Sequence, residues 1–291
     1  MDNKLKLKAY GKINLGIDVV DKLPNGYHLV RMIMQSVDLY DEIMVEKIDE
    51  GIHIETNLDY LPTGSGNICH KSANLMIERY KLDCGFKISI NKNIPVAAGL
   101  AGGSTDAATV MVAINKIMNL NISDEELMEI AVDIGADVPY CIKSSPMLAE
   151  GVGEKLTPIK GLENQWIVIT KPNIGVSTKD VYGNFKFENV EKKPDIDVLI
   201  SALEDKNYSL IEKSMENVLE SVTFDLYPIV KDIKGKMHEY GAQKSLMSGS
   251  GPSVFGIFKS YDKAKKVYKK FKKLYDQTYL VKTVNGRDSN E

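Results

Sequence analysis

The sequence predicts a globular protein of two domains that mix α-helices and β-strands. The chain has 291 residues, more than one hydrophobic core normally serves, so two domains are expected. An alternating strand pattern at residues 86–90 leads through a glycine-rich turn into a long apolar helix pattern at residues 107–118. A second strand–helix–strand pattern fills residues 254–284, late in the chain, as a second domain would require.

The part of the chain before the glycine-rich turn predicts strands and one helix. Residues 4–10 alternate lysine with apolar residues, as a half-buried strand does, and residues 17–20 form a second apolar run. The sequence D-K-L-P-N-G at residues 21–26 has the chemistry of a turn. Residues 37–46 predict another strand, and residues 67–80 have helical spacing.

The stretch P-V-A-A-G-L-A-G-G-S-T-D-A-A, residues 95–108, has the strand–turn–helix layout that holds a phosphate. Its three glycines permit unusual backbone angles and let an anion approach closely. The hydroxyls of Ser104 and Thr105 lie at the expected helix start, where they could cap the helix or meet an oxyanion or a metal. No lysine precedes them, so this is not a Walker A loop. A turn that merely packs a helix on a sheet explains the stretch equally well.

A capping box predicts the next helix. Ser123 is the expected N-cap with Glu126 three residues later, and Gly135 is the expected helix end. Asp137 follows in the sequence G-A-D-V-P, among apolar neighbours, where an ionised carboxylate is costly unless it is paired or hydrogen-bonded. It is either a turn aspartate that binds local amides or a catalytic carboxylate in a partly dry pocket.

The rest of the chain alternates helices and strands. A domain boundary is expected near residues 161–164, which gives domains at 1–161 and 162–291. A second glycine loop, S-G-S-G-P-S, occupies residues 248–253. The other expected elements are a hairpin at 148–156, strands at 166–170, 254–258 and 279–284, and helices at 178–182, 195–203, 210–219 and 229–240.

Composition excludes several classes of function. The net charge of −3 gives no basic field for nucleic acid, although the helix expected after residue 260 carries seven lysines that we interpret as a solvated face. Three cysteines without metal-ligand spacing predict neither a disulfide framework nor a zinc site. The N-terminal M-D-N-K-L-K-L-K lacks the apolar core of a signal peptide, and the most apolar long window contains three glycines and Asp106. A cytoplasmic protein is therefore expected.

Two pairs of residues near the N-terminus are candidates for a site. Lys12 and Asn14 share one face of an extended chain, although a solvated strand lysine is the simpler interpretation of Lys12. Tyr27 and His28 follow a tight turn and could bind a planar ring. Taken alone, this pair favours a loop aromatic packed on the core beside a surface histidine.

Taken together, these signals resemble the GHMP small-molecule kinases over nearly the whole chain, to about residue 258. The motifs are K-I-N-L-G at 12–16, A-G-L-A-G-G-S-T-D-A-A at 98–108 and the late S-G-S-G-P-S loop. The N-G-Y-H, G-A-D-V-P, E-G-V-G-E and E-N-V-L-E sequences add to them. Of these, N-G-Y-H with E-G-V-G-E makes the resemblance specific to the branch that phosphorylates diphosphocytidyl methylerythritol. The resemblance implies an α+β fold with an N-terminal ATP-binding domain, a ferredoxin-like C-terminal domain and an active site in the cleft between them.

The resemblance also implies roles for individual residues. It makes Asp137 the catalytic carboxylate, Lys12 its cationic partner, and Ser104 a neighbour of the Mg²⁺ that accompanies ATP. Substrate contacts are assigned to Asn14, Tyr27, His28 and, more loosely, Tyr182. ATP binding is assigned to Pro95, Val96, Ala97, Ala98, Gly99, Leu100, Ala101, Gly102, Gly103, Ser104, Thr105 and Asn67. Ala101 replaces a frequent glycine and Thr105 a frequent serine, and neither change removes needed chemistry.

The implied reaction transfers phosphate from ATP to the 2-hydroxyl of the methylerythritol unit, within the methylerythritol phosphate route to isoprenoids. The partners are then ATP, Mg²⁺ and this small alcohol, with no nucleic acid and no membrane, in a monomer or homodimer. Two alternatives stay open. One is another GHMP kinase that acts on homoserine or mevalonate, and the other is a nucleotide-binding sensor without catalysis on the same fold.

Overall fold

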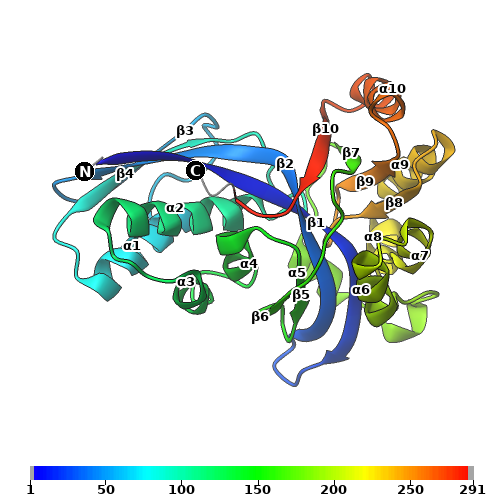
Figure 1. Cartoon of the computed structure of the whole chain (residues 1–291), viewed down its shortest axis with the longest axis horizontal. Helices are drawn as coiled ribbons and strands as arrows, with labels where there is room; N and C mark the ends of the chain where they lie inside the picture. The colour runs from blue at the N-terminus through cyan, green and yellow to red at the C-terminus, as the bar shows by residue number, and fades with distance from the viewer. Residues whose placement is uncertain (1–2, 288–291) are drawn as a thin grey trace.

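The computed structural model describes residues 3–287 and contains a mixed sheet with helices packed on it (Figure 1). Seven strands follow the order β3-β4-β2-β10-β7-β9-β8, while β1 and β5 pair with β2, and β6 pairs with β5. The strands are β1 Lys4–Lys22, β2 His28–Ile48, β3 Ile52–Thr56, β4 Gly85–Asn91, β5 Met147–Glu150, β6 Lys155–Pro158, β7 Trp166–Lys171, β8 Lys244–Met247, β9 Val254–Phe258 and β10 Gln277–Val284.

The helices fall into one group in each half of the chain. The N-terminal group is α1 Ile68–Tyr80, α2 Gly102–Met118, α3 Asp124–Ala131 and α4 Val138–Lys143. The C-terminal group is α5 Thr178–Gly183, α6 Ile196–Glu204, α7 Tyr208–Ser214, α8 Glu220–Leu226, α9 Pro228–Glu239 and α10 Tyr261–Lys272, with a 3₁₀ turn at Phe187–Asn189. No helix in residues 3–287 is long and apolar enough to cross a membrane.

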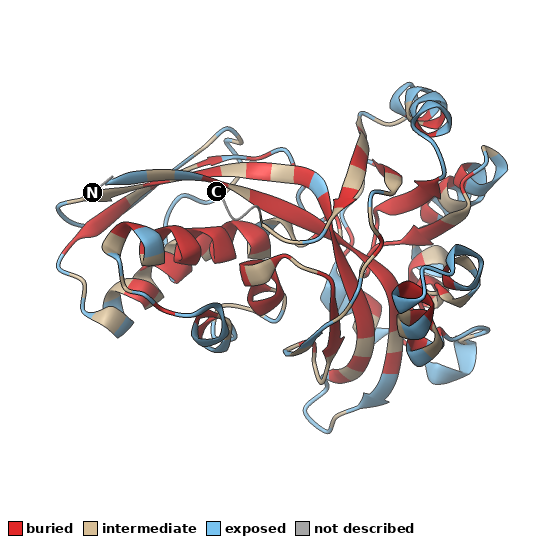
Figure 2. Ribbon diagram, viewed as in Figure 1, coloured by how far each residue is buried: buried red, intermediate tan, exposed pale blue. Residues whose placement is uncertain are grey.

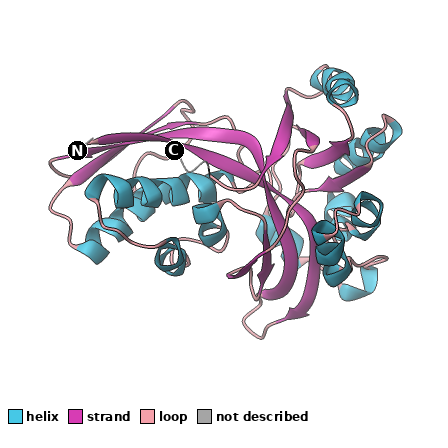
Figure 3. Ribbon diagram, in the orientation of Figure 1, coloured by secondary structure: helices cyan, strands magenta, loops and turns pink. Residues whose placement is uncertain are grey.

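The first two strands form one long antiparallel hairpin that runs from one half of the molecule into the other (Figure 3). The two apolar runs expected at 4–10 and 17–20 are therefore parts of a single strand. Its register shifts between Tyr10 and Lys12, at Gly11. This bulge frees the amide of Lys12 from the ladder, and the amide donates to the carbonyl of Leu100 at 3.0 Å. The first strand is thus tied to the glycine-rich loop.

The N-terminal helices pack on this sheet through α2, which is buried along most of its length (Figure 2). The predicted capping box is confirmed, because Ser123 Oγ accepts from the amide of Glu126 at 3.2 Å. The expected helix end is wrong: α3 stops at Ala131, and a turn leads on to Gly135. The chain then enters α4, a short helix that the sequence did not predict and that begins directly after Asp137.

The C-terminal half has the expected ferredoxin-like arrangement. Its four strands lie in the order β10-β7-β9-β8, all antiparallel, with α10 connecting β9 to β10. Helix α10 buries Ala264, Val267 and Phe271 and exposes most of its lysines, as a solvated basic face does. The last strand also pairs with β2, where Val284 lies opposite Ser36, so the two halves share hydrogen-bonded strands.

One predicted helix is wrong in an informative way. The helix expected at residues 210–219 ends at Ser214, and Asn217 instead forms a parallel bridge with Ile17 of β1. The amide of Ile17 donates to Glu216 O at 3.0 Å, and the amide of Val218 donates to Ile17 O at 3.1 Å. These hydrogen bonds to a distant strand outweigh local helical spacing. Helix α8 and strand β8 were also not predicted from the sequence.

Candidate active site

Two pockets meet in the cleft between the halves. The first, of about 500 Å³, is lined by the glycine-rich loop, by Lys12 and by residues of the second glycine loop. The second, of about 1010 Å³, is lined by Tyr27, His28 and helix α5. The residues that line both pockets are Met32, Ser104, Asp137, Thr178 and Tyr182. A group transferred from a ligand in one pocket to a ligand in the other would pass these side chains.

The first glycine loop combines left-handed backbone with close packing. Ala97, Gly99 and Ala101 have φ angles of 51°, 72° and 57°. A Cβ on Gly99 would lie 2.2 Å from Ser248 O, so the second glycine loop needs glycine there. A Cβ on Gly103 would meet nothing closer than a methyl of Ile68 at 3.7 Å. The space beside Gly103 therefore belongs to the pocket, where a ligand can approach the backbone.

The helix after this loop begins without a side-chain cap. Its N-cap residue is Ala101, so Ser104 and Thr105 lie inside the first turns, and the expectation that they could cap the helix is wrong. The first amides of α2 thus keep their capacity to bind an anion. Ser104 faces both pockets, and no hydrogen bond ties its hydroxyl to another described residue. Thr105 and Leu100 are buried and lie outside the lining of the first pocket, and their contact with ATP stays a prediction.

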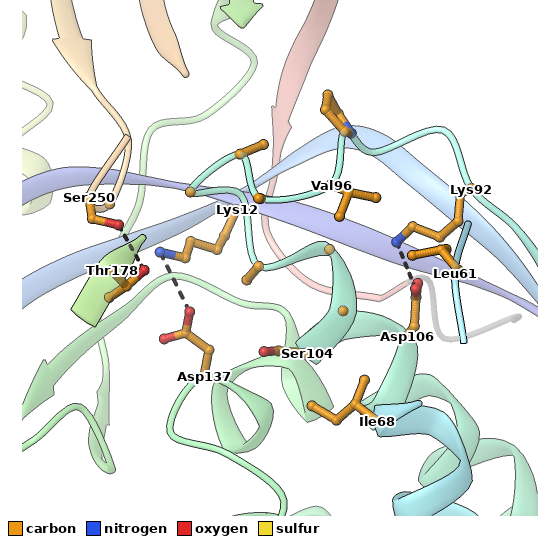
Figure 4. A pocket seen from close by; sticks show the side chains of 18 of the residues that line it. Lys12, Leu61, Ile68, Lys92, Val96, Ser104, Asp106, Asp137, Thr178 and Ser250 are labelled. Carbon is orange, nitrogen blue, oxygen red and sulfur yellow. Dashed lines mark hydrogen bonds and ion pairs between the residues drawn. The ribbon is translucent and has the colours of Figure 1, made fainter. Parts of the chain in front are cut away.

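Lys12 and Asp137 come together where the first pocket meets the second (Figure 4). Asn14 lies beside Lys12 in the lining of the first pocket. Lys12 is buried, and its ammonium donates to Asn14 Oδ1 at 2.8 Å and lies 3.8 Å from Asp137 Oδ2. The interpretation of Lys12 as a solvated strand lysine is therefore wrong. Asn14 is fully buried and also accepts from the amide of Gly249 at 3.0 Å. Contact between Asn14 and a substrate stays a prediction.

The position of Asp137 is fixed by the start of α4, where it is the N-cap residue, but its carboxylate forms no capping hydrogen bond there. The alternative of a turn aspartate that binds local amides is therefore wrong. The side chain is 33% exposed and opens into both pockets. A carboxylate in this position can accept a proton from a bound ligand while the ammonium of Lys12 offsets charge beside it.

A second charged cluster lies at the far end of the first pocket (Figure 4). Lys92 pairs with Asp41 and, at 2.7 Å, with Asp106 Oδ2, and all three side chains are buried. Asp41 Oδ1 also accepts from the amide of Ile94 at 2.8 Å. Burial raises the pKa of Asp106 well above its ordinary value, and the attraction of Lys92 opposes this only in part. This cluster was not predicted, although a lysine just before the glycine-rich stretch was a signal for it.

The second pocket holds an aromatic wall. Tyr27 is 64% exposed, and His28 is only 6% exposed. The local expectation of a packed aromatic beside a surface histidine is therefore wrong. The rings of His28 and Tyr182 lie 5.4 Å apart. Burial, and secondarily the charge of Lys22, lowers the pKa of His28. Its Nε2 has no hydrogen-bond partner among the described residues, so a neutral imidazole faces this pocket with unused polar capacity.

Asn67 has a structural role in addition to its place in the lining of the first pocket. Its Oδ1 accepts from the amide of Cys69 at 2.8 Å as the cap of α1, and its Nδ2 donates to Pro62 O at 2.7 Å. Contact between Asn67 and ATP stays a prediction. Around it the pocket is apolar, with Leu61, Ile68 and Val96 in its lining, as a nucleobase requires.

The second glycine loop contributes more than the sequence indicated. Ser248 Oγ donates to Gly99 O at 2.9 Å, which fixes the two loops against each other. Ser250 Oγ lies 2.9 Å from the hydroxyl of Thr178, at the start of α5 (Figure 4). Thr178 and Ser250 were not predicted as site residues, and the glycine–serine composition of the loop was the one signal for Ser250.

Comparison with known proteins finds matches in both halves of the chain. The family model for the GHMP kinases N terminal domain matches residues 67–145, and the model for the GHMP kinases C terminal matches residues 199–277. A Clostridium botulinum protein named 4-diphosphocytidyl-2-C-methyl-D-erythritol kinase is 49% identical over 95% of this chain and 99% of its own length. This chain belongs to the GHMP kinase family. The N-terminal match contains the glycine-rich loop and Asp137, and the C-terminal match contains the second glycine loop.

Other GHMP kinases show how far the similarity extends. An Acetivibrio thermocellus protein of the same name is 49% identical over 96% of this chain and 99% of its own. A crystal structure of a 4-(cytidine 5'-diphospho)-2C-methyl-D-erythritol kinase superposes with a TM-score of 0.84 at 29% identity, covering 97% of this chain and 100% of that one. A homoserine kinase from Cytophaga hutchinsonii has a TM-score of 0.76 at 22% identity, over 98% and 96% of the chains, which shows the shared fold alone.

Proposed function

We propose that this GHMP kinase transfers the γ-phosphoryl group of ATP to the 2-hydroxyl of 4-diphosphocytidyl-2-C-methyl-D-erythritol. The observation that carries the proposal is the meeting of two pockets at Asp137 and Ser104, with Lys12 beside them. Relatives at 49% identity over 95% of the chain carry the name of this kinase, which supports the choice of substrate. The product would belong to the methylerythritol phosphate route to isoprenoids.

In the proposed mechanism, Asp137 accepts the proton of the substrate alcohol. The alcohol oxygen attacks the γ-phosphorus, the bond from that phosphorus to the bridging oxygen breaks, and ADP leaves. A tertiary alcohol is a weak nucleophile, so a carboxylate within reach supports the bond-forming step. Lys12, 3.8 Å from that carboxylate, orients the two groups and offsets the developing charge. Phosphoryl transfer depends mainly on positioning and electrostatics, which suits so small a set of groups.

The first pocket would hold ATP. Its adenine would lie at the apolar end near Leu61, Ile68 and Val96, and its phosphates at the uncapped start of α2 beside Gly103. Residues 3–287 contain no group of three His, Cys, Asp or Glu side chains that could hold a metal ion. Mg²⁺ fits here as an ion carried by the nucleotide, with the hydroxyl of Ser104 nearby, because Mg²⁺ commonly binds few protein ligands together with phosphates. It would neutralise phosphate charge.

The second pocket would hold the cytidine end of the alcohol substrate. The exposed Tyr27 offers a ring for stacking at this pocket, and His28 and Tyr182 form its wall. Cytosine has an amino donor beside ring acceptors, which a neutral imidazole and nearby backbone can pair with. This aromatic and imidazole set favours the cytidine substrate over homoserine or mevalonate, which have no ring to recognise.

ADP release from ATP–Mg²⁺ tests the proposal, with diphosphocytidyl methylerythritol, homoserine and mevalonate compared side by side. We expect turnover with the cytidine substrate and none with the other two. Turnover with homoserine or mevalonate instead would keep the family and overturn the role of the Tyr27 and His28 pocket. Nucleotide binding without turnover of any of the three would favour the sensor alternative.

A further inference from the structure

The segment 216–218 bridges the strand that carries Lys12 and the second glycine loop. Its backbone pairs with Ile17 on β1, three residues after Asn14. The side chain of Asn217 is 3% exposed and turns toward the second glycine loop. It donates to Met247 O and to Gly249 O, both at 2.9 Å, and its Oδ1 accepts from the amide of Leu219 at 3.0 Å. One buried amide thus clamps both sides of the bend at Gly249.

The amide of Gly249 determines how the side chain of Asn14 is oriented. Asn14 Oδ1 receives two donors, the amide of Gly249 at 3.0 Å and the ammonium of Lys12 at 2.8 Å. Its Nδ2 faces the sulfur of Met32 at 3.5 Å, a weak acceptor. A flipped Asn14 would point its NH₂ group at two donors. The Gly249 amide therefore keeps the oxygen of Asn14 directed at Lys12.

We propose that Asn217 is a positioning residue for phosphoryl transfer, acting through Gly249 and Asn14 on the ammonium of Lys12. Lys12 has three donors on a flexible stem and lies 3.8 Å from Asp137. A fixed acceptor on its other side holds the ammonium where it can serve both the carboxylate and the substrate alcohol. Asn217 touches neither ligand, since it lies outside the lining of both pockets. This inference rests on the proposed function for its kinetic consequences.

Two variants of Asn217 separate its donors from its acceptor. Asn217→Ala removes the whole amide, whereas Asn217→Asp keeps an acceptor for the Leu219 amide and places oxygen against the two carbonyls. If the donors position the loop, both variants lower kcat by about tenfold, as coupled residues of one network do, with little change in the KM for ATP. Should the alanine variant fail to fold, the near-isosteric aspartate variant still tests the donors.

The matched control is Asn115, which clamps a different loop far along α2. Its Nδ2 donates to Ile122 O at 2.9 Å, and its Oδ1 accepts from the amide of Ile122 at 3.1 Å. Asn115→Ala therefore removes a comparable brace outside both pockets. We expect it to leave kcat unchanged. A loss of kcat that matched the Asn217 variants would mean that Asn217 acts through stability alone.

A double-mutant cycle with Asn14→Ala identifies the route of the effect. If Asn217 acts through Asn14, then Asn217→Ala changes kcat little once Asn14 is already alanine. Full additivity of the two effects would overturn the proposal. The cycle uses whichever alcohol the unaltered chain phosphorylates, because Lys12 serves any acceptor. Failure with diphosphocytidyl methylerythritol would therefore count against the proposed function, and the cycle run with another alcohol would still test the role of Asn217.

Hydrogen exchange supplies a readout that needs no turnover. The Gly249 amide donates to Asn14 Oδ1, so its exchange is slow when the route is intact. We expect faster exchange at Gly249 in Asn217→Ala, Asn217→Asp and Asn14→Ala, and unchanged exchange in Asn115→Ala. Protection of Gly249 that survives both Asn217 variants would refute the positioning role even if kcat fell.

Discussion

Two groups of lysine and aspartate side chains lie at the first pocket. They differ in how far their carboxylates are exposed. Lys92 is enclosed with Asp41 and Asp106, and all three side chains are almost completely buried. Lys12 is equally buried, but its carboxylate partner Asp137 is 33% exposed and lies 3.8 Å away. The first group pairs its lysine with two carboxyl groups inside the protein, although Asp106 Oδ1 has no hydrogen-bond partner among the described residues. The second group leaves a carboxylate open to a ligand.

The same division applies to two glycines of the first glycine loop. Packing requires glycine at position 99, because a Cβ there would lie only 2.2 Å from the carbonyl oxygen of Ser248. A Cβ on Gly103 would not clash with any described residue, and the space beside Gly103 is part of the first pocket. In both comparisons, the residue enclosed by other residues of the chain maintains the structure. The residue that borders open space in a pocket is available to a ligand. This distinction ranks the expected effects of mutations.

Asp137→Asn is expected to have the largest effect on turnover. The amide keeps the size of the side chain and loses the proton acceptor, and no capping hydrogen bond is lost with it. We expect kcat to fall by about 10²- to 10⁴-fold, the contribution typical of a positioned base. The affinity for ATP, measured by calorimetry, and the melting temperature should stay the same.

The matched control for this change is Asp133→Asn. Asp133 is an exposed carboxylate four residues earlier, outside both pockets, and it should tolerate the substitution. Normal turnover by Asp137→Asn would remove Asp137 from the proton transfer. The exposed carboxylate of Asp137 would then have no functional role that distinguishes it from the buried carboxyl groups beside Lys92.

Lys92→Met should show the opposite pattern, a loss of stability. Removing the lysine leaves the carboxyl groups of Asp41 and Asp106 buried without their cation. Breaking a buried pair in this way costs about 3–5 kcal/mol of unfolding free energy. Urea unfolding of the nucleotide-free protein measures this loss.

An exposed pair on the same sheet provides the comparison for Lys92. Lys6 lies 2.6 Å from Glu42, with side chains 58% and 34% exposed, so Lys6→Met should leave the free energy of unfolding almost unchanged. If Lys92→Met cost no more than Lys6→Met, the enclosed cluster would not be the structural element we describe.

Much of the fold could be predicted because its signals are local. The capping serine of α3 and the helical spacing of α1 and α10 depend on neighbours in the sequence, and each of these helices was predicted. Contacts with distant strands could not be predicted in this way. Residues 216–218 had helical spacing, but their pairing with Ile17 depends on a strand two hundred residues earlier.

The site was predicted in part for the same reason. The resemblance named Lys12 and Asp137 by position, but the 3.8 Å between them depends on tertiary structure. It also included Leu100 and Thr105, which the structure buries, and their contact with ATP stays a prediction. A sequence pattern does not show whether a side chain is buried or faces a pocket. The role of Lys92 was not predicted, because its partners Asp41 and Asp106 are brought to it only by the tertiary structure.

Alanine at the two glycines should separate packing from ligand binding within one loop. Gly99→Ala forces backbone movement at a residue with φ of 72°, which is expected to cost about 1–3 kcal/mol of stability. Gly103→Ala should stabilise the free protein slightly, by up to about 1 kcal/mol, because it improves helix propensity in open space. Its added methyl group should raise the KM for ATP.

Thermal unfolding and ATP kinetics on the two glycine variants test this division. Stability should fall with Gly99→Ala, whereas Gly103→Ala should retain its stability and bind ATP less well. Equal losses of stability at both positions would show that both glycines serve packing, and an unchanged KM for ATP in Gly103→Ala would remove the nucleotide from that part of the pocket.

His28 should give the smallest effect, visible as a pH dependence of substrate binding. Burial holds its pKa below 6.5, so the imidazole is neutral at pH 7.5 and gains a proton only as the pH falls through that lowered pKa. Protonation places a positive charge in the wall beside Tyr182 and removes the acceptor at Nε2. If the neutral form binds the cytidine substrate, its KM should rise toward acid pH by at most about tenfold at pH 5.5.

The His28→Gln variant is the comparison that makes this small effect interpretable. Glutamine keeps a polar side chain and does not titrate in this range, so the KM of the variant should be higher at pH 7.5 and nearly constant between pH 7.5 and 5.5. Comparing parent and variant at each pH cancels the titration of ATP itself, which is common to both. A variant that kept the pH dependence of the parent would show that another group causes it. The unused nitrogen of His28 would then be a feature of the wall and not of substrate recognition.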